Sequence, residues 1–257
     1  MQICVTEGYI QALLFVVYED GRVLALDGGC RCDVAAMTAF LEEGLKKSWS
    51  DVGLQVISHI HPDHAGAAPL LSRRYGLPLA APEGINRWYA GIGGFLQHKI
   101  DISLGYFVVY VMGKPWRNIF YRRRIVMDHA LKDGDFLPGF PDWQALSTPG
   151  HTNHDMVFYH QETKTLYAAD VILYVNRRFQ LPFPVSMPEA MGESLLRIRN
   201  LDVNTLILAH GGVMRVEGMA EIVDGLLKRL DESRLNPMLR RLRPLTRFSP
   251  ELRTHLL

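Results

Sequence analysis

The spacing of apolar residues changes from segment to segment along the first part of the chain. Short apolar runs bounded by turn residues or helical stretches are typical of buried β-strands; they lie at 9–17, 22–27, 54–57 and 78–81. The sequence YEDG between the first two runs predicts a β-hairpin. Residues 33–46 and 65–76 repeat apolar side chains at helical spacing, and Asp33 is the expected N-cap of the first helix. This alternation predicts an α/β protein with helices outside a sheet.

The strand pattern returns after residue 130 and leads into further helices. MVFYH at 156–160 and TLYAAD at 165–170 predict a second hairpin, and a helix over 190–201 precedes a strand at 205–209. One apolar stripe then predicts an amphipathic helix; it consists of Met219, Ile222, Val223, Leu226 and Leu230. The last part of the tail predicts a short helix capped by Ser249, with Pro250 at its first position.

Residues 83–130 interrupt this regular alternation. The segment is rich in Trp, Tyr and Phe and carries Arg122, Arg123 and Arg124 in a row. We interpret it as a mostly helical insertion in a single domain that spans residues 1–257, followed by a helical C-terminal tail at about 214–257. The tail carries further arginines, which are typical of a solvated helix face; they are Arg240, Arg241, Arg243 and Arg247.

The composition mainly helps to set aside some classes of protein. The chain is 48% hydrophobic and 21% charged, which fits a folded core, and its formal net charge of +1 predicts no general attraction to nucleic acid. The apolar run at 102–113 is too short to span a bilayer, which takes about 20 residues. Three cysteines without a disulfide pattern, and no secretory signal, favour a cytoplasmic location. We interpret Cys30 and Cys32 as incidental thiols rather than a redox or metal site.

Metal-binding side chains gather in the sequence SHIHPDHAG at 58–66 and recur after later strands. In layered α/β proteins, ligand sites collect where strands end, because a rigid sheet holds the loops there. The candidate ligands with this placement are His59, His61, Asp63, His64, His151, Asp170 and His210. Imidazole and carboxylate groups suit zinc, iron or manganese, and the absence of a thiolate from this set favours an open catalytic site over a closed structural one.

These residues carry a resemblance to a known family. HIHPDH resembles the His-x-His-x-Asp-His signature of the metallo-β-lactamase-fold hydrolases, and TPGHT, LYAAD and LILAHGG resemble the later motifs in the same order. VLALDGG, which contains Asp27, resembles the early strand of the family. The resemblance covers roughly residues 9–212 and implies an αββα sandwich of two mixed β-sheets, with the site at one edge.

The resemblance also implies two divalent metal ions, with zinc the first expectation. His59, His61 and His151 would hold one ion, Asp63, His64 and His210 the other, and Asp170 would bridge them. Two such ions share a water whose pKa falls to near 7, and the resulting bridging hydroxide attacks the substrate.

Two of the candidate ligands and the length of the chain after the last motif narrow the branch of the family. Asp170 stands where some β-lactamases use cysteine, and His61 stands where diiron oxygen reductases of this fold carry glutamate. Nothing after His210 is long enough for an extra nuclease domain. The remaining group contains glyoxalase II-like thioesterases, lactonases and small phosphodiesterases.

Two further features bear on catalysis and substrate. The sequence GHTNHDM places His154 and Asp155 after His151, so we expect His154 to donate a proton to the leaving group, alongside Asp63 as a catalytic ligand. The alternative is that His154 and Asp155 shape the turn. The segment 83–130 predicts an apolar pocket with a basic rim for an acyl-bearing, anionic small molecule, although a homodimer surface or shallow membrane contact stays open.

The leading hypothesis is therefore a dinuclear metallo-hydrolase that cleaves an ester-type bond, most simply a thioester or a lactone with an apolar acyl part. A phosphodiesterase of the same fold is the enzymatic alternative. A metal-containing regulatory module that acts through protein contacts is the alternative outside enzymology.

Overall fold

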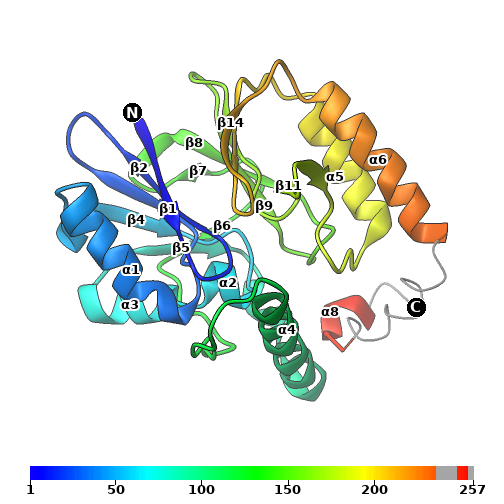
Figure 1. Cartoon of the computed structure of the whole chain (residues 1–257), viewed down its shortest axis with the longest axis horizontal. Coiled ribbons are helices and arrows are strands. Elements are labelled where there is room, and N and C mark those ends of the chain that lie inside the picture. The colour runs from blue at the N-terminus through cyan, green and yellow to red at the C-terminus, as the bar shows by residue number, and fades with distance from the viewer. Residues whose placement is uncertain (236–247, 254–257) are drawn as a thin grey trace.

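Two six-stranded β-sheets pack face to face in the computed structural model, which describes residues 1–235 and 248–253 (Figure 1). The first sheet has the order β1-β2-β3-β4-β5-β6, with strands Gln2–Glu7, Ala12–Val17, Val23–Leu26, Val52–Val56, Leu79–Pro82 and His129–Leu131. The second has the order β14-β13-β10-β9-β8-β7, with strands Gly212–Arg215, Thr205–Leu208, Thr165–Tyr167, Met156–His160, Phe140–Ser147 and Phe136–Leu137. Strands β3 to β6 run parallel, as do β10 and β13, and the other neighbours run antiparallel, so both sheets are mixed.

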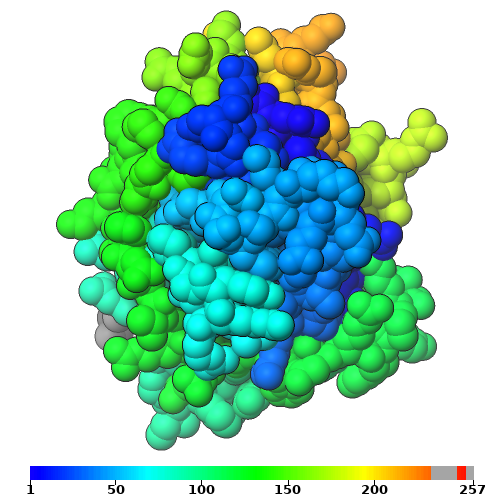
Figure 2. Space-filling view, turned by 90° about the vertical axis from the view of Figure 1, so that its left-hand side faces the viewer, coloured from blue at the N-terminus to red at the C-terminus, as the bar shows by residue number. Residues whose placement is uncertain are grey.

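Helices cover the outer faces of both sheets. Helices α1 (Val34–Ala39) and α3 (Ala68–Tyr75) lie on the first sheet, and the space-filling view shows this layer closing that side of the molecule (Figure 2). Helices α5 (Pro188–Arg199) and α6 (Ala220–Leu235) lie on the second sheet (Figure 1). The predicted αββα sandwich is confirmed.

The apolar runs are continuous because strands such as β2 are buried on both faces. Leu14 and Val16 point between the sheets, whereas Leu13 and Phe15 pack against the outer helices. Successive side chains of a strand point to opposite faces, so a strand between two apolar layers needs apolar residues at every position. The same alternation recurs in β3 and β13.

The helix predicted over 33–46 is broken into three short pieces. A 3-10 turn (Arg31–Asp33) precedes α1, and a π-helical turn (Phe40–Gly44) follows it. Asp33 occupies the N-cap position of α1 as predicted, but its side chain makes no capping hydrogen bond to that helix. Its carboxylate instead accepts the backbone N–H groups of Tyr9 and Cys30, both at 2.8 Å, and so caps the 3-10 turn and anchors the β1–β2 loop.

The expectation of a mostly helical insertion holds only for part of 83–130. A 3-10 turn (Ile85–Arg87) leads to α4 (Gly91–Val111), but residues 112–128 form neither helix nor strand, and β6 follows. The helix ends because Gly113 takes a positive φ of 66° and Pro115 cannot continue it. None of the described helices is both long and apolar enough to cross a membrane.

The first residues of the C-terminal tail, which was predicted to be helical, form a strand. Residues 212–215 form β14, not helix, before α6 follows as predicted. Pro250 begins the short helix α8 (Pro250–Arg253), which packs against α4. The tail arginines Arg240, Arg241, Arg243 and Arg247 lie outside the described residues. Short strands that the sequence pattern did not predict are β1, β6, β7, β14 and the small pair β11 (Leu173–Val175) and β12 (Arg178–Gln180).

Candidate metal centre

The candidate ligands come from separate loops that meet at one edge of the sandwich. His59 and His61 follow β4, and the short helix α2 (Pro62–Ala65) carries Asp63 and His64. The other three, His151, Asp170 and His210, follow β8, β10 and β13. Because β4, β10 and β13 each lie inside a sheet, their ends are held in place by neighbours on both sides.

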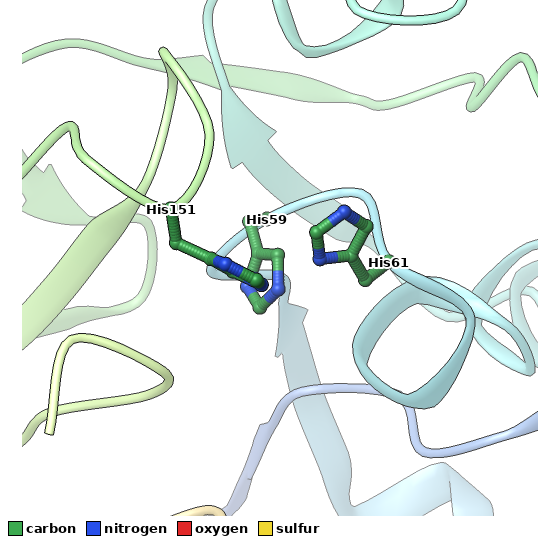
Figure 3. Close-up of side chains that lie close together, drawn as sticks. All are labelled: His59, His61 and His151. Atoms are coloured by element: carbon green, nitrogen blue, oxygen red, sulfur yellow. The ribbon is translucent and has the colours of Figure 1, made fainter. Parts of the chain in front are cut away.

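The first group of ligand-type side chains is a set of three imidazoles. A nitrogen from each of His59, His61 and His151 lies within 4.8 Å of a nitrogen from the other two. The rings stand nearly perpendicular to one another, at centroid distances of 4.8, 5.2 and 4.5 Å. Figure 3 shows the three rings converging from two loops. Such an arrangement presents three nitrogen donors to one point.

The second group combines a carboxylate with two imidazoles. The ligand atoms of Asp63, His64 and His210 also lie within 4.8 Å of one another. Oδ2 of Asp63 is 3.4 Å from Nε2 of His210 and 3.7 Å from Nε2 of His64.

Asp170 lies between the two groups and turns one oxygen toward each. Its Oδ1 is 3.1 Å from Nε2 of His64 and 3.3 Å from Nε2 of His210. Its Oδ2 is 3.7 Å from Nε2 of His151 and 4.0 Å from Nε2 of His59. A carboxylate in this position can contact ions in both groups at once.

A buried hydrogen-bond network around Asp27 orients one histidine of each group. Oδ2 of Asp27 accepts the Nδ1–H of His64 at 2.7 Å and the hydroxyl of Ser58 at 2.9 Å, and it also accepts the Tyr167 hydroxyl. Ser58 in turn lies 3.0 Å from Nδ1 of His59. Asp27 has a left-handed backbone conformation (φ 63°), which aspartate tolerates better than most residues. The network leaves Nε2 of both histidines directed into the site.

The remaining nitrogens of the first group are oriented in the same way. Nδ1–H of His151 donates to the carbonyl of Pro184 at 2.7 Å, which leaves its Nε2 free for a ligand role. Nε2 of His61 instead faces Oδ2 of Asp101 on α4 at 3.4 Å, so Nδ1 is its nitrogen for the site. The Asp101 carboxylate is itself held by the Tyr89 hydroxyl and the Gln97 amide, both at 2.8 Å.

The pKa of each histidine depends on the carboxylates beside it. In the first group, burial opposes a charge on His61, but Asp101 outweighs it and raises the pKa. Burial lowers the pKa of His59 well below its usual value and that of His151 to about 4, so both rings are neutral at pH 7 and keep a lone pair. Burial also opposes charge on His64 and His210. There, however, the carboxylates of Asp170, Asp27 and Asp63 outweigh it and raise both pKa values, that of His210 to about 9. A divalent cation bound here would take the place of the protons that His64 and His210 hold beside these carboxylates.

The donor set fits two metal ions. Among the described residues, the buried Nε2 atoms of His59 and His64 have no hydrogen-bond partner, although both point toward Asp170. Buried polar atoms are rarely left without a partner, so an unpaired nitrogen here is consistent with a metal ligand. Nitrogen and carboxylate oxygen donors suit zinc, iron or manganese.

His154 and Asp155 lie beside the site with their polar atoms already engaged. Nε2 of His154 accepts the backbone N–H of Ile60 at 3.3 Å, and its Nδ1 lies 2.9 Å from Oδ1 of Asn153. Asp155 accepts the backbone N–H groups of His151 and Thr152 at 2.8 and 2.7 Å, and burial raises its pKa to about 7. This geometry supports the alternative that both residues shape loops around the ligands; proton donation by His154 stays a prediction.

Comparison with protein families adds an independent observation. The model of the Metallo-beta-lactamase superfamily matches residues 6–210, which include every candidate ligand. The chain belongs to the metallo-beta-lactamase superfamily. Membership agrees with the resemblance seen in the sequence motifs and with the two-sheet architecture.

Relatives of this superfamily member are hydrolases by name. A hydroxyacylglutathione hydrolase of Bdellovibrio bacteriovorus is 26% identical over 199 residues, which are 76% of this chain and 61% of the relative. A probable metallo-hydrolase of Bacillus subtilis, YflN, is 20% identical over 188 residues, which are 68% of this chain and 70% of the relative. The chain thus matches less than two thirds of the length of the first of these relatives.

Solved structures of superfamily members share the fold. A metallo-beta-lactamase family protein from Thermus thermophilus aligns with a TM-score of 0.62 and 22% identity over 88% of this chain and 75% of that chain. The Rm3 metallo-beta-lactamase aligns with a TM-score of 0.64 and 20% identity over 90% of each chain.

Sequence reasoning missed the role of Asp101 entirely. It occupies an aromatic insertion, 40 positions from His61, and no ligand-like spacing links the two residues. The one available signal is that Asp101 is the single acidic residue of the stretch 91–127. Asp27 belongs to a recognisable motif, but its contact with Ser58 follows from the pairing of β3 with β4, and its contact with Tyr167 from the packing of the two sheets.

Proposed function

We propose that the protein is a dinuclear metal-dependent hydrolase of ester-type bonds, acting on a thioester or lactone with an apolar acyl part. The observation that carries the proposal is the position of Asp170, with one carboxylate oxygen toward each group of ligands. His59, His61 and His151 would hold one divalent ion, and Asp63, His64 and His210 the other. Zinc is the first candidate, with iron or manganese also compatible with these donors.

When bound, the ions would supply Lewis acidity and lower the pKa of a water molecule so that it attacks at neutral pH. The protein residues set the geometry of that chemistry. Asp27 and Ser58 orient His64 and His59, and Asp101 orients His61, so that the lone pairs converge without a reorganisation cost. Hydrolysis then adds water across the acyl bond: the acyl carbon gains the hydroxyl, and the leaving thiol or alcohol gains the proton.

A cavity beside the ligands supports an apolar substrate. A space of about 530 Å³ reaches His210 and is lined mainly by apolar side chains, among them Ile10, Phe107, Val111 and Val175. Its size falls within the usual range of small-molecule sites. The name hydroxyacylglutathione hydrolase describes cleavage of a thioester, which favours an acyl–sulfur bond for this chain as well.

The test combines metal analysis with a substrate panel. We expect about two divalent ions per purified chain and faster turnover of medium-chain acyl thioesters or lactones than of bis(p-nitrophenyl) phosphate. Asp170→Asn should lose metal and turnover, whereas the exposed Asp142→Asn should retain both. A preference for the phosphodiester would instead assign the phosphodiesterase alternative. Stoichiometric metal without turnover of any of these substrates would favour a regulatory module, and protein without stoichiometric metal would refute the proposal.

A further inference from the structure

Helix α4 buries several polar side chains and exposes many apolar ones. A surface helix of a globular protein normally buries its apolar stripe and exposes its polar one. In α4 the buried side chains include Gln97, His98 and Asp101 beside Ile102 and Val109. Its exposed positions are mostly apolar, with Ile92 83%, Tyr110 74% and Val111 68% exposed.

The exposed apolar side chains continue from α4 onto the loop that follows it. The Trp116 ring stacks on Tyr106 at a centroid distance of 4.5 Å, and Tyr106 contacts Phe120 at 6.1 Å. Lys99 lies over both Phe120 and Phe95, at 5.1 and 5.3 Å from the ring centroids. We call this surface the α4 face; it comprises the exposed residues of α4 with Trp116, Arg117, Phe120, Arg122, Arg123 and Arg124.

The charge on this part of the chain is of one sign. Residues 91–127 contain six basic residues, Lys99, Lys114, Arg117, Arg122, Arg123 and Arg124. Lys114 pairs with Glu7 at 2.8 Å, and the other five belong to the α4 face. The one acidic residue of this stretch, Asp101, is buried against His61 and does not reach the surface. The face is therefore apolar, aromatic and basic at once.

We propose that the α4 face binds an anionic lipid surface. Aromatic and apolar side chains beside arginine and lysine match the boundary between acyl chains and acidic headgroups. A symmetric homodimer would bring the five cations of this face close to their copies on the partner, and like charges in proximity oppose association. The face also adjoins the apolar cavity, since Phe107 and Val111 belong to both. If the proposed function holds, an acyl substrate could pass from the bilayer to the site, but the lipid contact itself does not depend on that function.

Tryptophan fluorescence offers a direct test on the unaltered protein. Trp49, Trp88 and Trp143 are at most 5% exposed, whereas Trp116 is 71% exposed. Vesicles of phosphatidylglycerol and phosphatidylcholine in equal parts should therefore shift the emission of Trp116 to shorter wavelength and quench it when the lipid is brominated. Phosphatidylcholine vesicles should do neither. About 1 M salt, which shortens the Debye length to about 3 Å, should weaken the binding.

Co-sedimentation of variants with the same vesicles separates the contribution of the arginine charges from that of the aromatic side chains. Replacing two exposed arginines, in Arg122→Glu/Arg124→Glu, should lower the partition coefficient roughly 30-fold or more, since each basic residue near the surface contributes roughly a fivefold change. Removing two interfacial aromatics, in Tyr110→Gln/Trp116→Gln, should lower it about tenfold.

Matched controls carry the same substitutions on other surfaces. Phe136→Gln/Leu196→Gln and Arg73→Glu/Arg229→Glu alter exposed residues away from α4 and should bind vesicles like the original protein. Circular dichroism confirms folding of every variant. The proposal is overturned if the unaltered protein ignores anionic vesicles, or if the controls lose as much binding as the α4 variants. It is also overturned if the protein is a dimer in solution that Tyr110→Gln/Trp116→Gln dissociates, because the face would then belong to a second copy.

Discussion

Asp101→Asn tests whether α4 sets the orientation of a metal ligand. Asp101 faces Nε2 of His61 at 3.4 Å and is held in place by Tyr89 and Gln97. Burial opposes a charge on Asp101, but the neighbouring His61 lowers its pKa below the usual value, so the carboxylate is ionised at neutral pH. The asparagine keeps the shape of the side chain and removes the charge that fixes the His61 ring.

The size of the effect follows from the kind of contact. Loss of a residue that orients a metal ligand typically lowers metal affinity by about 10- to 100-fold, or roughly 1.4–2.7 kcal/mol. A hydrogen bond to a charged partner contributes about 1.5–3 kcal/mol, which is the same range. The asparagine oxygen can still accept one bond from Tyr89 or Gln97. We therefore expect the metal-free protein to lose only about 1–2 kcal/mol of unfolding free energy.

The assay is competition for zinc or cobalt with a chromophoric chelator, which resolves the two binding steps. Asp101→Asn should weaken one step, that of the ion held by His59, His61 and His151, and leave the other nearly unchanged. Asp63→Asn should show the opposite preference, and the exposed Asp142→Asn should change neither. Equal weakening of both steps, or unchanged affinity in a folded Asp101→Asn protein, would refute the reasoning.

Three further outcomes can be checked by unfolding experiments. Asp27→Asn should lower the unfolding free energy by about 2–4 kcal/mol in urea, because Ser58, His64 and Tyr167 lose a charged acceptor, whereas Tyr167→Phe should lower it by about 1 kcal/mol. Burial raises the pKa of Asp33 to about 6 in the folded protein. Its contribution to stability is therefore present below pH 4 and is lost as the pH rises through 6. Relative to Asp33→Asn, the unfolding free energy of the original protein should fall by about 2–3 kcal/mol between pH 4 and 7. Removing metal with a chelator should lower the Tm in calorimetry, and zinc at about 100 times its Kd should restore about 2.7 kcal/mol per site.

Much of the fold could be predicted from the sequence because its central strands are buried on both faces. The runs at 9–17 and 205–209 are continuous for that reason, and they correspond to β2 and β13. Short strands escaped prediction because pairing, more than composition, creates them. Residues His129–Leu131 form β6 only by aligning with β5, and two of these three residues are exposed.

The candidate ligands could be predicted for a related reason. Each follows a strand, and the strands bring to one edge residues as far apart in sequence as His59 and His210. The residues that orient the ligands could not be predicted in this way. Asp27 reaches Tyr167 across the sandwich, and Asp101 reaches His61 from an inserted helix, so only the packing of distant elements makes these contacts.

Helix α4 shows why its segment was the hardest to interpret. Sequence patterns assume that apolar residues face the core, yet α4 must bury Asp101 to contact His61 and therefore turns other residues outward. Its inner face also packs Ile102 and Val109 into the core, while many apolar side chains on its outward face contact solvent, which solvent alone does not favour. The contact with His61 accounts for the buried Asp101, and the proposed lipid surface accounts for the exposed apolar side chains. Both faces belong to one helix of 21 residues, so the proposed lipid surface would contact the same element that holds His61 in place.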